Sequence, residues 1–163
     1  MRNICFYFQI HQPIRLDRYR FFDIGQKHFY YDEFQTEERI RNAVEQSYLT
    51  ANRTISEMIK SSNGKFKCSF SISGITIELL EQYAPEVIDS FKELSKTGCV
   101  EFLAEPFAHS LASVFDSAEF ERQVKMHSDK IELLFGKRPT SFYNTELIYS
   151  DEIGEMISKM GYK

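Results

Sequence analysis

Polar side chains that could carry out acid–base or nucleophilic chemistry gather behind three short apolar segments of this sequence. They are Gln9, His11, Gln12 and Pro13 at the end of segment 3–10; Glu105, Pro106 and His109 after segment 99–103, which also contains Glu101; and Asn144, Thr145 and Glu146 after segment 140–143. Carboxylates and imidazoles are the groups that general acid–base and nucleophilic catalysis uses. A fold that brings the ends of these segments together therefore assembles a candidate site.

The intervening sequence predicts the elements that position these groups. Strands are expected over 3–10, 66–73, 99–103 and 140–143, helices over about 32–60, 75–84, 85–97, 117–135 and 151–160, and loops over 11–32, 104–115 and 144–150. This is βα repeated four times, which predicts an α/β fold with a parallel sheet and right-handed crossovers. The carboxyl ends of parallel strands share one rim, so we expect the three polar groups to meet there.

The last helix is followed by Gly161, Tyr162 and Lys163, and this pattern predicts the start of a fifth strand. We therefore expect residues 1–163, without an internal boundary, to form the first four βα units of a larger barrel.

Each candidate also has a purely structural interpretation. The segment around His11 fits a simple turn, and His109 fits local packing. Glu101 alternates with apolar residues in a strand otherwise fit for burial, so it needs a partner or a cavity. Glu105 fits an ordinary loop carboxylate, and Glu146 fits a first-turn acid at a helix N-terminus. The sequence alone leaves these alternatives open.

The remaining histidines and the aromatic loop have less specific interpretations. His127 lies on the apolar stripe of its helix and is expected in a core or interface, whereas His28 is expected to be a solvated loop residue. The loop aromatics are Tyr19, Phe21, Phe22, Phe29, Tyr30, Tyr31 and Phe34. We expect most of them to form a satellite core beneath the loop. Aromatic faces also suit sugar rings, so one or two could line a subsite.

The bulk composition limits the class of protein. The chain has 163 residues, 42% hydrophobic and 27% charged, which fits one globular domain. A net charge of −4 gives no reason to expect nucleic acid or an anionic membrane as partner. Three separated cysteines predict neither a disulfide framework nor a zinc site. The N-terminus is too polar for a signal peptide and no apolar run is long enough to span a membrane, so we expect a cytoplasmic protein.

The three polar groups together resemble glycoside hydrolase family 57. The family begins with a strand ending in His-Gln-Pro, here residues 11–13, and a second region has Gly-x-x-Glu, here Gly98 to Glu101. A third region carries the nucleophile, here the run Asn-Thr-Glu-Leu-Ile-Tyr at 144–149. The three regions occur in the family's order across the whole chain, and the third in register with the other two is the most specific.

The resemblance implies a (β/α)7 barrel that acts on α-1,4-linked glucans such as starch, glycogen or maltodextrin, with retention of configuration and without a metal or other cofactor. It assigns the nucleophile to Glu146 and sugar binding at the cleavage point to His11 and Glu101. Further candidates for substrate binding are Gln12, Glu105, His109 and Asn144. The family's general acid is an aspartate downstream of the nucleophile, beyond residue 163, so residues 1–163 alone are expected to be inactive.

Several alternatives stay open at this stage. Hydrolysis cannot be told from transglycosylation, because amylases, 4-α-glucanotransferases and branching enzymes of the family share these regions. A metal-dependent polysaccharide deacetylase needs two histidines close in sequence, and no His-x-x-x-His occurs here. A catalytically inactive glucan-binding protein and an unrelated α/β domain are the remaining readings. The sequence predicts no oligomeric state.

Overall fold

The computed structural model describes residues 4–163, and its framework is a three-stranded parallel sheet. The strands are β1 (Phe6–Ile10), β2 (Cys68–Ile72) and β3 (Val100–Phe102), in the order β1-β2-β3. In register, Gln9 lies beside Ser71 and Ser69 lies beside Glu101. The three parallel strands confirm the predicted alternation. The predicted first strand includes residue 3, which lies outside the described residues.

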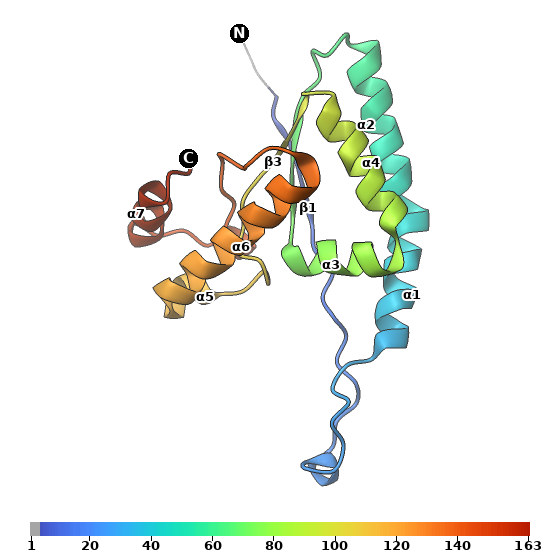
Figure 1. Cartoon of the computed structure of the whole chain (residues 1–163), viewed down its shortest axis with the longest axis vertical. Coiled ribbons are helices and arrows are strands. Elements are labelled where there is room, and N and C mark those ends of the chain that lie inside the picture. The colour runs from blue at the N-terminus through green and yellow to red at the C-terminus, as the bar shows by residue number, and fades with distance from the viewer. Residues whose placement is uncertain (1–3) are drawn as a thin grey trace.

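Helices fill the connections (Figure 1). They are η1 (Phe21–Asp23), α1 (Glu33–Ala43), η2 (Val44–Tyr48), α2 (Leu49–Ser61), α3 (Gly74–Tyr83), α4 (Pro85–Lys96), α5 (Ala112–Phe115), α6 (Ser117–Phe135), η3 (Thr145–Leu147) and α7 (Asp151–Lys159). The predicted helix over 32–60 is thus one rod in which η2 is a single π-helical stretch. The predicted loop over 104–115 ends in the short helix α5. None of the helices in residues 4–163 has the length and apolarity to cross a membrane.

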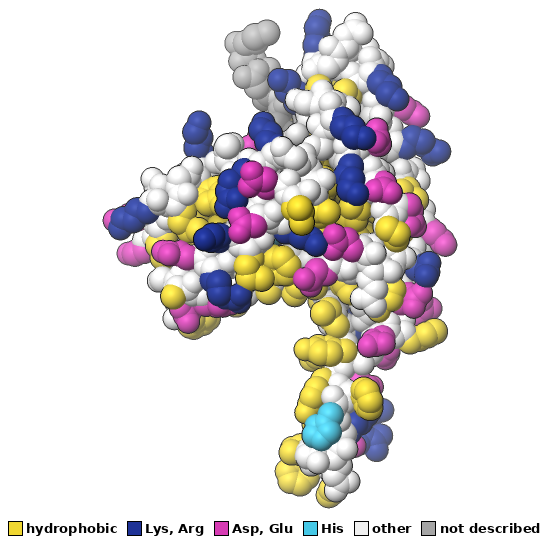
Figure 2. Space-filling model, viewed as in Figure 1, with side chains coloured by type: hydrophobic (Ala, Val, Ile, Leu, Met, Phe, Trp, Pro, Cys, Tyr) yellow, Lys and Arg dark blue, Asp and Glu magenta, His cyan; other side chains and the backbone are white. Residues whose placement is uncertain are grey.

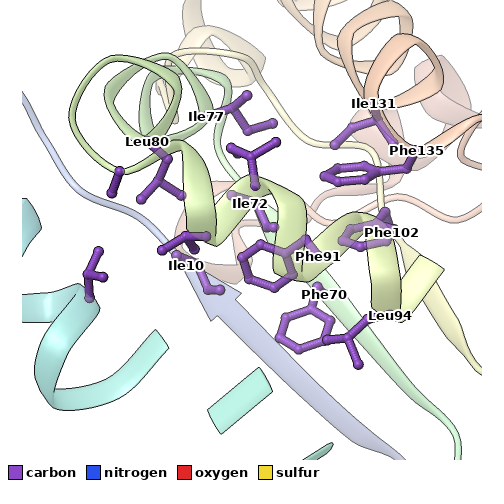
Figure 3. Packing of buried hydrophobic residues seen from close by; sticks show 14 of the residues in the cluster. Ile10, Phe70, Ile72, Ile77, Leu80, Phe91, Leu94, Phe102, Ile131 and Phe135 are labelled. Atoms are coloured by element: carbon purple, nitrogen blue, oxygen red, sulfur yellow. The ribbon is translucent and has the colours of Figure 1, made fainter. Parts of the chain in front are cut away.

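The main core lies between the helices and one face of the sheet, as Figure 3 shows. Strand alternation places Ile10, Phe70, Ile72 and Phe102 on this face. They pack against Ile77 and Leu80 of α3, Phe91 and Leu94 of α4, and Ile131 and Phe135 of α6. The rings of Phe102 and Phe135 stack with centroids 4.1 Å apart. Each fully buried side chain of this kind stabilises the fold by roughly 1.5–3 kcal/mol.

The opposite face of the sheet is polar and carries Tyr7, Gln9, Ser69, Ser71 and Glu101. Here the structure corrects the expectation that Glu101 sits in a strand fit for burial, because its side chain is exposed. The apolar neighbours of Glu101 belong to the helix-covered face, and the period of two sends the carboxylate to the other.

The predicted fourth strand over 140–143 forms only one parallel bridge, between Phe142 and Ala104. The amide of Ala104 donates to Ser141 O at 2.9 Å, and Tyr143 N donates to Ala104 O at 2.8 Å. The ladder stops there because the next position that would face this segment is Pro106, which has no N–H to donate, whereas the amide of Glu105 points to the β2 side and bonds to the His127 ring. On its other side the segment exchanges backbone hydrogen bonds with Lys163, from Phe142 N at 3.0 Å and to Thr140 O at 3.0 Å.

The loop between β1 and α1 extends away from the body as an arm, seen at the bottom of Figure 1. The arm pairs with itself through an antiparallel bridge between Leu16 and Tyr31. Its aromatic side chains are largely exposed, 79% for Phe21 and 84% for Phe22, and Figure 2 shows apolar side chains along it. The predicted satellite core is therefore wrong: the arm lies beyond the end of the sheet, where no other helix or strand of residues 4–163 packs against it. His28 is exposed, as predicted.

The start of α3 supports the loop after β3. The amide of Ile75 donates to Phe107 O at 3.2 Å. A Cβ atom at Gly74 would lie 2.3 Å from the Phe107 ring, so only glycine allows this approach. The loop that carries Glu105 and His109 is thereby fixed to the helix that follows β2.

Candidate active site

The candidate site lies at the carboxyl ends of the strands, as predicted for the polar groups. His11 follows β1, Glu105 and His109 follow β3, and Glu146 lies in the 3-10 turn η3. The bridge between Ala104 and Phe142 draws the segment before Glu146 alongside β3. Parallel order thus joins residues that are far apart in sequence at one edge.

Glu105 is the buried centre of the cluster, with a fully buried side chain. Its Oε1 accepts a hydrogen bond from Ser71 Oγ at 2.7 Å, and its Oε2 lies 3.0 Å from His109 Nδ1. A buried carboxylate is costly unless its oxygens are paired, and here both are. Complete burial rules out the reading of Glu105 as an ordinary loop carboxylate.

His127 lies behind Glu105 and is fully buried, which confirms the prediction of a core position. The amide of Glu105 donates to His127 Nδ1 at 3.3 Å. The other ring nitrogen, Nε2, lies 2.8 Å from Ile72 O and must donate to it, because a carbonyl only accepts. Burial lowers the pKa of His127, in agreement with this neutral tautomer.

His109 connects the buried carboxylate to the rim. Its Nε2 lies 3.5 Å from Glu146 Oε1 and 3.3 Å from Gln9 Nε2, and 6% of its side chain is exposed. The hydrogen bond to Glu105 raises the pKa of His109, burial opposes this rise, and the charge of Glu146 adds to it. Two carboxylates on one imidazole favour the cation.

His11 stacks on His109 with ring centroids 4.2 Å apart. Its Nδ1 lies 2.8 Å from Ser73 Oγ, which is 2.8 Å from Thr76 Oγ1 at the start of α3. Burial lowers the pKa of His11, and the neighbouring charge of His109 lowers it further. The stacked pair therefore favours a neutral His11 beside a protonated His109.

The backbone around Glu146 is strained. Glu146 and Leu147 both have left-handed conformations, with φ of 53° and 58°, and φ of His109 is 53°. Such values are unfavourable for residues other than glycine, asparagine and aspartate. Of the four non-glycine residues with positive φ in the described chain, three lie here. Strain of this kind concentrates at functional sites. Glu146 lies in the first turn of the short η3 and not of a longer helix, since α7 begins only at Asp151.

Three predicted site residues lie outside this cluster. Gln12 turns toward the helical rod, where its Nε2 donates to Tyr48 Oη at 3.0 Å. Glu101 lies lower on the polar face and accepts from Ser141 Oγ at 2.7 Å. The buried side chain of Asn144 donates to Ile148 O at 2.8 Å and to Ser113 Oγ at 3.1 Å. The bond to Ile148 O closes the turn that holds Glu146, and the bond to Ser113 ties that turn to α5.

The structure also adds Tyr143 and Tyr7, which sequence reasoning did not assign to the site. Tyr143 Oη donates to Gln9 Oε1 at 2.9 Å, and its ring lies 5.0 Å from that of Tyr7. Burial raises the pKa of Tyr143, which keeps the hydroxyl protonated as a donor. Ser71, which donates to Glu105, was missed as well. The sequence signal for it was the alternation of Ser69 and Ser71 with apolar residues, which marks one face of β2 as polar.

No group of three or more His, Cys, Asp or Glu side chains within residues 4–163 is arranged to hold a metal ion. The polar contacts of the cluster are instead carboxylate, imidazole, amide and hydroxyl groups bonded to one another. Such groups can attack an electrophilic carbon, orient hydroxyl groups by charge-assisted hydrogen bonds, and hold protons.

A parallel sheet covered by helices, with acids and imidazoles at its strand ends, places this chain among the α/β proteins whose sites form at the carboxyl ends of the strands. Comparison with known proteins makes the assignment specific. The family described as glycosyl hydrolase family 57 matches residues 5–163. This chain belongs to glycosyl hydrolase family 57.

Individual relatives agree with the family. A protein of Methanocaldococcus jannaschii named "Putative alpha-amylase" is 34% identical over 98% of this chain, which spans 34% of that relative's length. The 4-alpha-glucanotransferase of Thermococcus litoralis superposes with a TM-score of 0.71 at 18% identity, over 98% of this chain and 21% of that one. The alpha-amylase AmyC of Thermotoga maritima gives 0.70 at 14% identity, over 100% of this chain and 39% of that one. These two structures show the fold alone.

Proposed function

We propose that this chain carries the nucleophile of a retaining glycosidase that acts on α-1,4-linked glucans, and that the nucleophile is Glu146. The observation that carries the proposal is the Glu146 carboxylate itself. Its side chain is 73% exposed on the rim, and one oxygen lies 3.5 Å from the mostly buried His109 ring. Accessibility together with a fixed neighbour whose pKa is raised, so that it tends toward the cation, suits an anion that must attack a substrate.

In the proposed reaction a Glu146 oxygen forms a bond to the anomeric carbon while the glycosidic C–O bond breaks. The departing oxygen takes a proton from a second carboxylic acid, which then deprotonates the water that releases the sugar. His11, stacked at the same rim, is proposed to hold sugar hydroxyls, since its Nδ1 is engaged by Ser73 and its other nitrogen can face the ligand.

The second carboxyl group is proposed to be an aspartate outside residues 1–163. Besides Glu146, the carboxylate in the described cluster is Glu105, which is fully buried and bonded to Ser71 and His109. It cannot protonate a departing glycosidic oxygen from that position. The proposed architecture follows: β1, β2, β3 and segment 140–143 would be consecutive parts of a (β/α)7 barrel, supported by their parallel order.

Transfer to an acceptor sugar instead of water is the second candidate. The same Glu146 intermediate serves both reactions, because only the attacking hydroxyl differs. The observation in its favour is that one structural neighbour is a 4-alpha-glucanotransferase and another is the branching enzyme of Pyrococcus horikoshii.

The proposal is tested by Glu146→Gln in the intact protein, assayed on soluble starch for reducing ends and on maltooligosaccharides for transfer products. Loss of a nucleophile lowers turnover by several orders of magnitude. We expect loss of both activities with glucan binding largely retained. Substantial turnover in the purified variant would reject Glu146, and binding without turnover in the wild-type protein would favour an inactive glucan-binding protein.

A further inference from the structure

Glu105 is a buried carboxylate whose two oxygens already have partners within the protein. Its side chain is fully buried, yet the sequence suggested a residue that binds substrate. Its oxygens are occupied by Ser71 and His109, at 2.7 and 3.0 Å. A substrate hydroxyl could reach it only by displacing one of these partners. The geometry therefore favours a role that Glu105 exerts through His109.

The contact with Glu105 fixes the protonation of one His109 nitrogen. An ionised carboxylate only accepts hydrogen bonds, so Nδ1 must carry the proton that it shares with Glu105. The ring is then held by its buried edge, and the opposite nitrogen, Nε2, faces Gln9 and Glu146. Stacking on His11 fixes the plane of the ring as well. Orientation and tautomer are thus both determined.

The state of Nε2 determines the direction of the neighbouring hydrogen bonds. In neutral His109, Nε2 accepts from the Gln9 amide while Tyr143 donates to Gln9 Oε1. In the cation, Nε2–H donates, either to Glu146 or to a Gln9 amide turned so that its NH2 group faces Tyr143. The two orientations of an amide occupy nearly the same volume, so the cluster accommodates both states.

The charged groups around His109 favour the cation. Glu105 lies against Nδ1 and Glu146 against Nε2, whereas the stacked His11 is the one base beside it with a lowered pKa. Tyr143 faces the ring only through Gln9. An imidazolium at this place attracts the Glu146 carboxylate and helps to hold a residue whose backbone is strained.

We propose that Glu105 is a positioning residue: it holds His109 by Nδ1, so that Nε2–H is directed at the Glu146 carboxylate, and it does not itself touch the sugar. The proposal rests on the proposed role of Glu146 as nucleophile. It assigns Glu105 a different task from the substrate contact predicted from sequence, and it makes Ser71 the second support of the same carboxylate. His109 in turn orients the attacking oxygen toward the sugar.

The test uses the intact protein with Glu105→Gln, His109→Gln, His109→Ala and Glu146→Gln. Glu81→Gln is the control, because Glu81 is an ion-paired carboxylate on α3 that contacts Lys130 at 2.6 Å. Turnover and KM are measured on a maltooligosaccharide, and histidine titration is followed by NMR of 15N-labelled imidazoles. The titration needs neither substrate nor activity.

We expect Glu105→Gln to lower kcat by about 10- to 100-fold, the range typical of a misplaced reacting group, with little change in KM. The His109 resonance should titrate at lower pH in this variant and be unchanged in Glu81→Gln. His109→Gln should retain more turnover than His109→Ala, because a glutamine amide can still donate at the position of Nε2. Both His109 variants keep the buried Glu105 carboxylate, so this comparison still tests the proposal if Glu105→Gln folds poorly.

The outcomes separate the two proposals. If Glu146→Gln keeps substantial turnover, the proposed function is wrong and this inference is wrong with it. If Glu146→Gln is inactive but Glu105→Gln keeps the wild-type kcat and His109 titration, the inference alone is overturned. Equal kcat in His109→Gln and His109→Ala would also overturn it, since no donor at Nε2 would then be needed.

Discussion

The imidazoles of His11 and His109 stack 4.2 Å apart, although one follows the first strand and the other the third. Two cations at this separation repel each other, so the pair divides its protonation states. The pKa of His109 is raised by the bond to Glu105, and that of His11 is lowered by burial and by its charged neighbour. One ring is thus suited to hold an anion and the other to accept or donate as a neutral base.

A first prediction compares the two residues that the family resemblance places on the sugar. His11→Ala should lower kcat, because it removes hydrogen bonds that strengthen in the transition state. The loss of transition-state stabilisation is expected to be a few kcal/mol. Glu101→Ala should do the same if Glu101 reaches the substrate. Its exposed carboxylate is bonded to Ser141, about four strand residues or about 13 Å below Glu105.

The measurement is kcat together with the melting temperature in the intact protein. A variant that melts at a much lower temperature yet retains the wild-type kcat identifies a structural residue. That result for Glu101 would withdraw its predicted contact with sugar and leave the cluster around Glu105 intact.

A second prediction concerns pH and stability. The folded pKa of His109 is raised above 6.5, so its contribution to the free energy of unfolding is complete below 6.5 and is lost as pH rises through the folded value. His109→Gln should therefore destabilise the protein more at about pH 5.5 than at about pH 9. Urea unfolding at both values measures the difference.

His11 supplies a comparison of opposite sign. Its folded pKa is lowered, so the folded state resists a proton that the unfolded chain accepts, and stability falls as pH drops below 6.5. His11→Gln should relieve this loss, whereas His28→Gln on the exposed arm should change nothing. A destabilisation by His109→Gln that grows with pH would contradict the raised pKa.

A third prediction tests how α3 supports the site. Gly74→Ala places a methyl group 2.3 Å from the Phe107 ring, which must move and carry its loop with it. Overpacking of this kind costs about 1–3 kcal/mol. We expect lower stability and lower kcat together, because the same loop carries Glu105 and His109. The control is Gly74→Ala in a Phe107→Ala background, where the ring is absent and the added methyl should lower the melting temperature little. If Gly74→Ala lowers the melting temperature equally in both backgrounds, the contact with the Phe107 ring is not the cause.

A fourth prediction concerns the polypeptide of residues 1–163 expressed alone. It is expected not to cleave soluble starch, because the carboxylate that accompanies Glu146 in the cluster, Glu105, is buried and cannot act as the general acid. The β1 edge also leaves Ile4, Phe6 and Phe8 exposed by 81%, 43% and 36%, which favours self-association. Size-exclusion chromatography and a reducing-end assay check both points, and an active, cooperatively folded monomer would contradict them.

Local sequence was sufficient for the elements and for the edge at which the site forms. Alternation in segment 66–73 and the helical stripe around His127 gave the correct faces, because strand and helix periods depend on near neighbours alone. The family's three regions could likewise be recognised in order, since each is a short run of residues. The fourth strand was overpredicted because pairing depends on a partner: the next position after Ala104 that would face segment 140–143 is Pro106, which has no N–H to donate.

Only the tertiary structure decided which acid is buried and which is exposed. Glu101 and Glu105 both follow the strand's period, but Glu105 meets Ser71 from β2 and His109 from its own loop, whereas Glu101 meets Thr140 and Ser141 at the open face. The aromatic arm was misjudged for the same reason, because hydrophobic side chains become a core only where another element lies against them. Sequence thus determined the local conformation and the chemical groups available, and the long-range contacts determined which of those groups face one another.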